Sequence, residues 1–360
     1  MKMTIKIRYC YLLLFSFLGL MVCPQSQAAQ KPVILTLQTT YPKSFKPLSL
    51  LPYQLAKLVA KMSNNQLIIK VREPSDKVKV LDLDRAVSKN EVNMAYSGLA
   101  YRQHANPAIA LFTSVPFGPG AIEYAGWMYQ GGGLKRLNAY LKAENLNVVI
   151  FPISLSPTEG AGWFNKKINS PEDLKGLRIR VYGLGRQVYE ALGAKPVMMA
   201  GHKIYQAFEN HEIDAAEFST PAIDKTLQLY KVTKYYYLPG WHQPSTFLFL
   251  YINRDVWKNL TPQYREIIRV ASEEIVFQNF ISMQDAEKSA VLWLKKKTHI
   301  VSFSPEMLKI FHKTWLQIAN RLSAQNPEFK KTWDSLEAYR KNYAYWRGLN
   351  EQLYKLDTEY

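Results

Sequence analysis

Alternation of apolar and polar residues predicts the first strands and helices of this 360-residue chain. Residues 33–39 alternate with the two-residue period of a half-buried strand, residues 50–62 repeat apolar positions at helical spacing, and residues 67–71 alternate again. Helices and strands continue in turn to Gly240, and another strand follows at residues 246–252. This order is typical of α/β proteins with largely parallel sheets.

The last hundred residues have a helical pattern instead. A proline follows a capping residue at three points, and each point begins or interrupts a helix: Thr261-Pro262, Ser304-Pro305 and Asn326-Pro327. The first of these helices should run to about Leu294. The sequence therefore predicts an α/β fold that ends in a helical tail rich in Tyr and Trp.

One predicted strand carries two arginines. After a Ser-Pro helix cap at residues 170–171, residues 177–181 alternate apolar side chains with arginine, and the Gly-Leu-Gly turn at 183–185 precedes another helix. Arg180 lies near the carboxyl end of this strand, where open α/β sheets bind ligands. Arg178 points to the same face, so alternation alone does not choose between the two arginines.

Two segments share one layout. Residues 86–97 (AVSKNEVNMAYS) and 207–218 (AFENHEIDAAEF) each read as a helix end, a polar turn, a glutamate, a β-branched residue and a small apolar strand. The match predicts two similar lobes, with Tyr96 and Glu217 at equivalent strand ends that face one cleft. Only three positions are identical, so chance similarity is the alternative.

Several longer motifs occur in a fixed order over half of the chain: SVPFG at 114–118, YQGGGL at 129–134, SPEDLKGLRIR at 170–180, IDAAE at 213–217 and YYYLPGWHQP at 235–244. From about residue 86 to 270 the chain resembles the solute-binding receptors of tripartite ATP-independent periplasmic (TRAP) transporters. The resemblance is to the branch that binds 2-keto or 2-hydroxy carboxylates. It implies a two-lobed periplasmic-binding-protein type fold with doubly wound α/β sheets, a long connecting helix and a helical C-terminal tail.

The same resemblance implies how the chain is divided. We expect a signal peptide at 1–28, lobe I at 29–152 plus 246–285, lobe II at 153–245 plus 286–320, and a helical tail at 321–360. Some relatives dimerise through such a tail, so a homodimer formed by the C-terminal helices is one expectation.

The resemblance also assigns the site. Arg180 matches the clamp of the substrate carboxylate, and the planar fork of arginine suits that role because it gives two parallel, charge-assisted hydrogen bonds. Positions that hold a bridging cation in the family are here Glu159, Glu217 and the carbonyl of Phe218. The alternatives are a surface ion pair for Arg180, an exposed loop acid for Glu159 and a salt bridge within one lobe for Glu217.

Two positions depart from the family pattern. The family has Gln where this chain has Glu159, and commonly has Glu where it has Gln243, so we hypothesise that these two residues have exchanged roles. Oxygen ligands of this kind suit Na⁺ or Ca²⁺ rather than zinc, and a second carboxylate favours the divalent ion. Tyr96, Tyr101 and Phe117 are candidates for the wall of the pocket on the lid side, and aromatic core packing is the alternative for each.

The amino terminus has the pattern of a signal peptide. Three basic residues precede an apolar run at 9–22, and small residues lead up to Ala28, so we expect export to the periplasm and cleavage near Ala28. Both cysteines, Cys10 and Cys23, lie in this leader. The mature chain should then contain no thiolate metal site, cysteine nucleophile or disulfide.

The net charge is +17, and loss of the three basic leader residues leaves +14. Such a charge permits binding to nucleic acid or to an anionic membrane. The basic residues are scattered, however, and the densest group, at 295–297, adjoins an apolar helix face. We therefore expect no nucleic-acid partner.

The sequence thus predicts a periplasmic receptor that closes on a small organic carboxylate and delivers it to a TRAP membrane permease. A metal-assisted enzyme acting on a 2-keto acid is the first alternative, and it is disfavoured because no histidine, lysine or serine base can be assigned to the site. The six histidines show no metal-binding pattern. A diverged receptor or scaffold without keto-acid binding is the second alternative.

Overall fold

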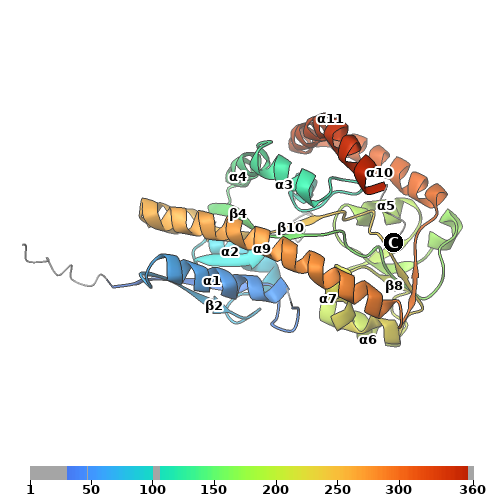
Figure 1. Cartoon of the computed structure of the whole chain (residues 1–360), viewed down its shortest axis with the longest axis horizontal. Coiled ribbons are helices and arrows are strands. Elements are labelled where there is room, and N and C mark those ends of the chain that lie inside the picture. Colours follow the sequence, from blue (N-terminus) through green and yellow to red (C-terminus); the bar gives the residue numbers. More distant parts are fainter. Residues whose placement is uncertain (1–30, 47, 100–105, 356–360) are drawn as a thin grey trace, which may run out of the picture. The chain divides into compact units, whose positions relative to one another are not determined.

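Two β-sheets organise the chain (Figure 1). The computed structural model describes residues 31–46, 48–99 and 106–355. The chain divides into two units, residues 1–31, of which only Lys31 is described, and residues 32–360, which contain both sheets. Everything below concerns the second unit.

The first sheet has five strands in the order β2-β1-β3-β10-β4. Their bounds are β1 (Val33–Thr39), β2 (Leu67–Arg72), β3 (Met94–Ser97), β4 (Val148–Ser156) and β10 (Thr246–Asn253). β1 pairs in parallel with β2 and β3, whereas β10 runs antiparallel between β3 and β4. The three strands predicted in this sheet are confirmed to within one residue at each end.

The second sheet has six strands in the order β11-β9-β5-β8-β6-β7. Their bounds are β5 (Gly162–Phe164), β6 (Arg178–Arg180), β7 (Lys195–Val197), β8 (Ala215–Ala216), β9 (Tyr235–Tyr237) and β11 (His299–Val301). Only β5 runs antiparallel to its neighbours, β8 and β9. Each sheet is therefore mostly parallel with one reversed strand, and the predicted two-lobed α/β fold is confirmed.

Three connections carry the chain between the sheets, at residues 157–161, at 238–245 and along the longer segment 254–298. Because β4 belongs to the first sheet up to Ser156, the first connection lies a few residues later than the expected crossing near residue 153. The limits of the two lobes themselves stay predictions.

Helices cover both sheets: α1 (Leu51–Met62), α2 (Leu83–Ser88), α3 (Ala121–Tyr129), α4 (Gly133–Ala143), α5 (Gly185–Ala191), α6 (Ile204–Glu209), α7 (Pro221–Asp224), α8 (Arg254–Asn259), α9 (Pro262–Leu294), α10 (Pro305–Gln325) and α11 (Pro327–Lys355). The last three begin at the predicted prolines, and the hydroxyls of Thr261 and Ser304 cap α9 and α10. Within the described residues, no helix is both long and apolar enough to cross a membrane.

The long helix α9 braces both sheets (Figure 1). It packs against β4 and α1 beside the first sheet and against α7, which follows β8 of the second sheet. Its buried Asn279 fixes the contact with β4, since Oδ1 accepts hydrogen bonds from Ser154 Oγ at 2.9 Å and from the Leu155 amide at 3.2 Å. This helix matches the bracing helix that the resemblance implies.

The C-terminal helices pack back onto the rest of the fold. α10 lies against α5, and α11 lies against α10, α3, α4 and the 3-10 helix at Pro107–Phe112. Glu123 on α3, whose side chain is 3% exposed, pairs with Arg347 of α11 at 2.8 Å. A buried carboxylate therefore ties the tail to α3.

The two segments predicted to be equivalent have the same local structure. A left-handed residue follows each helix two positions after its last residue, Asn90 (φ 58°) after α2 and His211 (φ 55°) after α6. In each case the following glutamate amide donates back to an alanine carbonyl at 2.8 Å, from Glu91 to Ala86 and from Glu212 to Ala207. A short strand then enters one of the two sheets, so both lobes repeat the helix-turn-strand unit that the sequence indicated.

Apolar side chains fill the space between the sheets and their helices in three buried clusters. The largest extends from β4 and β10 to α3, α4, α10 and α11, and includes Trp127 and Trp315. A second lies between the first sheet, α1 and α9, and a third packs β5, β8 and β9 against α6.

We predict that Asn279→Ala lowers the free energy of unfolding by about 1–3 kcal/mol, because the Leu155 amide and the Ser154 hydroxyl lose a buried acceptor. The neighbouring Gln278→Ala, at an exposed position of the same helix, should change it by less than about 0.5 kcal/mol. Urea unfolding followed by circular dichroism measures both. Equal losses would mean that α9 is not fixed to β4 through this amide.

Candidate carboxylate and cation site

Strand ends and connections from both sheets surround a cavity of about 100 Å³. The first sheet contributes Ser156 and Thr246, the second contributes Arg180 and the residues just after β8, and α9 contributes Met283. The position agrees with the general rule that α/β sheets bind ligands beyond the carboxyl ends of their strands.

Arg180 is the cationic centre of this cavity and is 5% exposed. Its Nη1 donates to Glu217 Oε1 at 2.8 Å and to the Glu217 carbonyl, and its Nε donates to the Met199 carbonyl at 3.3 Å. The guanidinium carbon lies 4.3 Å from the centre of the Tyr182 ring and 5.3 Å from that of Phe218. Within the described residues no hydrogen bond uses Nη2, which leaves donor capacity for an anion.

The other arginine of the strand has a different environment. Arg178 Nε and Nη2 donate to the Asp214 carboxylate at 3.0 and 2.7 Å, and its side chain is 41% exposed. It is not among the cavity-lining residues. The structure therefore separates two arginines that sequence alternation could not distinguish.

The Glu217 carboxylate is buried and held on both sides. Oε1 accepts from Arg180 and from the Tyr182 amide, each at 2.8 Å, and Oε2 lies 3.5 Å from His242 Nε2. Burial alone would raise the pKa of this carboxyl, but the charge of Arg180 and the contact with His242 outweigh burial and lower it. Glu217 is thus an ionised acid deep inside the protein.

Glu159 is the second buried acid and is 5% exposed. Its Oε1 accepts from Thr246 Oγ1 at 2.8 Å and from Gln243 Nε2 at 3.3 Å. Its Oε2 is buried and has no hydrogen-bond partner within the described part of the chain. Burial, and next the charge of Glu217, raise the pKa of the Glu159 carboxyl well above its usual value.

This pair of acids fits a cation. Glu159, Glu217 and His242 each offer a ligand atom within 4.8 Å of the others. His242 does not line the cavity, so it lies behind Glu217, whereas both carboxylates line it together with Phe218. A buried carboxylate oxygen without a partner is the acceptor that a bound Na⁺ or Ca²⁺ would satisfy. Glu159 and Glu217 would hold such an ion, which would neutralise their repulsion and offer a positive charge to an anionic ligand.

A third buried acid fixes the turn that follows Glu217. Asp224 accepts hydrogen bonds from the Ser219 amide at 3.0 Å, from Trp163 Nε1 at 3.2 Å and from the Tyr236 hydroxyl at 2.9 Å. Burial nevertheless raises the pKa of its carboxyl well above the usual value. Asp224 therefore holds the turn after Glu217 in place and is not among the residues that line the cavity.

Five predicted site residues come together around this one cavity: Glu159, Arg180, Glu217, Phe218 and Gln243. Tyr96 does not line the cavity; its ring packs 5.4 Å from the ring of Tyr41, which does. Tyr101, also predicted as a wall residue, lies outside the described residues.

The histidine prediction was wrong at one position. The sequence predicts no histidine beside Glu159, Arg180 or Glu217, yet the His242 side chain is fully buried beside Glu217. The two residues are far apart in sequence, and the connection after β9 folds back beside the end of β8. Sequence spacing carries no signal for such a contact, and the same is true of Asp224 and Thr246.

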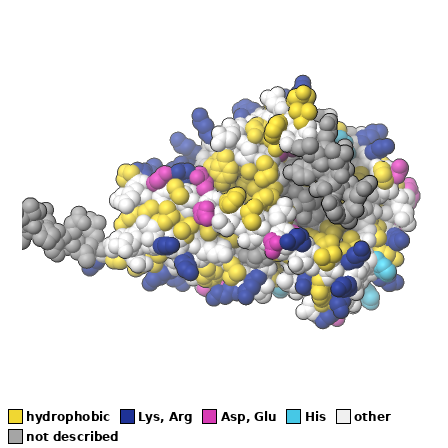
Figure 2. Space-filling model, viewed as in Figure 1, with side chains coloured by type: hydrophobic (Ala, Val, Ile, Leu, Met, Phe, Trp, Pro, Cys, Tyr) yellow, Lys and Arg dark blue, Asp and Glu magenta, His cyan; other side chains and the backbone are white. Residues whose placement is uncertain are grey.

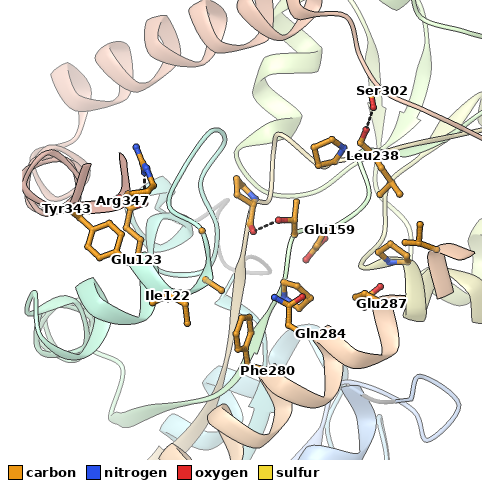
Figure 3. A pocket seen from close by; sticks show the side chains of 18 residues that line it. Ile122, Glu123, Glu159, Leu238, Phe280, Gln284, Glu287, Ser302, Tyr343 and Arg347 are labelled. Carbon is orange, nitrogen blue, oxygen red and sulfur yellow. Dashed lines mark hydrogen bonds and ion pairs between the residues drawn. The ribbon is translucent and has the colours of Figure 1, made fainter. Parts of the chain in front are cut away.

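A larger open groove of about 970 Å³ adjoins the connection at Glu159 (Figure 3). Ile122, Phe280 and Glu287 line it, and its one arginine in the described lining, Arg347, is held by Glu123 at 2.8 Å. The groove is larger than the cavity, but Arg347 is 41% exposed and screened by water, whereas Arg180 is buried, so the cavity is the better site for a carboxylate.

Comparison with known proteins agrees with this geometry. The family of bacterial extracellular solute-binding proteins, family 7, matches residues 43–326. A monocarboxylate 2-oxoacid-binding periplasmic protein of Nostoc sp. is 34% identical, over 83% of this chain and 82% of that protein. The chain therefore belongs to solute-binding protein family 7. It is a receptor of the TRAP transport class.

Solved structures of TRAP periplasmic solute-binding proteins superpose closely on this receptor. One from Colwellia psychrerythraea, with bound calcium and pyruvate, has a TM-score of 0.87 and 28% identity, covering 91% of the receptor and 100% of that chain. One from Pseudoalteromonas atlantica, with bound sodium and pyruvate, has a TM-score of 0.87 and 25% identity, covering 92% and 100%. The fold is therefore that of the ligand-binding members of the class.

The buried ion pair leads to a stability prediction. Arg180→Met should lower the free energy of unfolding by about 3–5 kcal/mol in EDTA, because Glu217 then stays buried without its counter-charge. Arg178→Met, two residues earlier, should cost about 1 kcal/mol or less, because that pair is half exposed and screened by solvent. Urea unfolding of both variants tests the difference, and similar losses would contradict the burial argument.

Proposed function

We propose that this receptor binds a small 2-keto or 2-hydroxy monocarboxylate, together with a cation, in the cavity around Arg180. The observation that carries the proposal is the buried guanidinium, which is oriented by Glu217 and retains donor capacity toward the cavity. Charge-assisted hydrogen bonds from arginine in a dry site are strong and directional, so they suit a carboxylate. Glu159, Glu217 and the carbonyl of Phe218 would hold the cation, with Gln243 beside them.

The size and lining of the cavity support a small ligand with one charged end. A volume of about 100 Å³ is far below the roughly 300–1,000 Å³ of sites for drug-sized ligands. Leu48, Leu248 and Met283 give the cavity an apolar part of its lining. Among the described lining residues Arg180 is the one cationic side chain, so a second carboxylate on the ligand would lack a partner.

The relatives support the same ligand class. Two of the similar solved structures contain pyruvate, one with calcium and one with sodium, and the Nostoc relative is described as a binder of monocarboxylate 2-oxoacids. Pyruvate has one carboxylate and one keto oxygen, which are the groups that Arg180 and a cation would engage.

Transport requires that the permease distinguish the loaded from the empty receptor. The cavity contains residues of both sheets and of their connections, so a ligand that bridges them would stabilise the closed arrangement. We propose that the exported, mature receptor then delivers the acid to membrane permease subunits.

Exposed Tyr345 (78%) and Trp346 (58%) on α11 support the proposed homodimer through the C-terminal helices.

An enzyme acting on a 2-keto acid is less well supported. The family is one of transport proteins, and the histidine near the site, His242, is shielded from the cavity by Glu217. Because His242 is not among the described residues that line the cavity, it is poorly placed as a general base, which must lie within hydrogen-bond reach of the proton it removes.

We predict that pyruvate at about 100 times its dissociation constant adds roughly 2.7 kcal/mol to the stability of the mature receptor in the presence of a cation. Thermal unfolding against a panel of 2-keto acids, 2-hydroxy acids and dicarboxylates, each with Na⁺, Ca²⁺ or EDTA, measures this. The shift should disappear in EDTA without added cation. A flat panel would overturn the proposed ligand class.

Arg180→Lys provides the matched test of the clamp. Lysine keeps the charge but loses the planar fork, so the shift caused by pyruvate should fall to a small fraction of that of the unmodified receptor. Arg178→Lys in the same strand should leave the shift unchanged. If the two variants respond alike, Arg180 does not clamp the carboxylate.

Export gives an independent prediction. Mass spectrometry of receptor recovered from the periplasm should show a chain that begins at residue 29 or 30, with no cysteine to alkylate, because Cys10 and Cys23 precede Ala28. An intact leader, or a lipid attached at Cys23, would contradict cleavage near Ala28.

A further inference from the structure

The two oxygens of the Glu159 carboxylate have different surroundings. Oε1 is anchored by the Thr246 hydroxyl and the Gln243 amide, while Oε2 is buried without a hydrogen-bond partner in the described part of the chain. Both anchors are neutral, so neither compensates the charge of the carboxylate. The side chain is thus held in one orientation with an unsatisfied oxygen, and an oxygen of the ionised Glu217 lies within 4.8 Å of one of its own.

We infer that this site selects a divalent cation of the Ca²⁺ type over Na⁺, and that Glu159 decides the choice. The inference rests on the proposed function of the same cavity. It goes further because similar receptors contain either ion and nothing in their likeness to this chain selects one of them.

The charge count within the cavity carries the argument. Among the described residues that line the cavity, the charged side chains are Glu159, Glu217 and Arg180, with a net charge of −1 when both acids are ionised. A bound monocarboxylate changes the sum to −2. A divalent cation neutralises this sum, whereas Na⁺ leaves one negative charge uncompensated in a buried site, and uncompensated buried charge is strongly unfavourable.

The ligand atoms support the same choice. The carboxylates face the cavity, while His242 lies behind Glu217, so the groups offered to the ion are oxygens. Ca²⁺ prefers oxygen ligands, and its affinity rises with the number of charged ligands in a site. Glu159 supplies the second such charge, and Thr246 and Gln243 act as positioning residues because they hold its Oε1.

The first experiment uses the mature receptor, stripped with EDTA and kept in a sodium-free choline buffer at constant ionic strength. CaCl₂ or NaCl is titrated with and without pyruvate, and the thermal unfolding midpoint is recorded. We expect half of the maximal shift at a Ca²⁺ concentration at least about a hundredfold below the corresponding Na⁺ concentration. Equal concentrations for the two ions would overturn the inference.

The second experiment compares two glutamate variants. Glu159→Gln keeps the shape and removes the charge, so the preference for Ca²⁺ over Na⁺ should fall by at least about tenfold. Glu287→Gln is the control, since Glu287 is another largely buried glutamate but lines the outer groove and not the cavity (Figure 3). An unchanged preference in Glu159→Gln would overturn the role of this residue.

A third variant tests the same role of Glu159 independently, in case Glu159→Gln does not fold. Thr246→Val removes one anchor of Glu159 but keeps its charge, so Ca²⁺ binding should weaken in the same direction and by a smaller factor. No loss of Ca²⁺ affinity in Thr246→Val would contradict the role of the anchored carboxylate.

The titrations without pyruvate distinguish a failure of this inference from a failure of the proposed function. A Ca²⁺ preference seen with the metal alone, and no response to any acid, would support the cation site and overturn the ligand class. A response to pyruvate that is equal in Ca²⁺ and Na⁺ would support the ligand class and overturn the inference. No response to any cation or acid would overturn both.

Discussion

The buried ion pair between Arg180 and Glu217 is the constraint on which the site depends. Strand pairing creates it, because β6 and β8 run in parallel with Arg180 opposite Ala216, and the Glu217 amide donates to the Arg180 carbonyl at 2.9 Å. Two charges removed from water must be compensated by neighbouring dipoles and rings. The Tyr182 amide and the rings of Tyr182 and Phe218 provide this compensation, so the pair is stabilised by the protein without a ligand.

Glu159 links this ion pair to the segments of chain that join the two sheets. Glu159 lies in the first connection, and its backbone is bonded to the second, through its amide to the Gln243 carbonyl and through its carbonyl to the Gly240 amide. Its side chain meanwhile accepts from Thr246 at the start of β10. A ligand and cation that engage Glu159 and Arg180 together would therefore join the connections to the second sheet.

The outer surface has a different character from the cavity. Lysine and arginine side chains are spread over the visible face among apolar and neutral residues (Figure 2). This spread agrees with the scattered basic residues of the sequence and with the absence of any nucleic-acid motif in it. The high net charge could attract anions at long range, but recognition depends on one buried arginine, because exposed charges are screened by salt whereas buried ones are screened much less.

The sequence alone determined the elements and much of the site. Alternation and proline caps located β1, β2, β10 and the three C-terminal helices, since these signals depend on neighbours within a few residues. The repeated turn before Glu91 and Glu212 indicated two lobes, and motif order assigned Arg180, Glu159 and Glu217 to one site.

Only the tertiary structure decided which arginine is buried, that Tyr41 and not Tyr96 reaches the cavity, and that His242 and Asp224 support the acids. Those contacts join segments that are distant along the chain, and sheet register and the path of the connections set them, which no local pattern records.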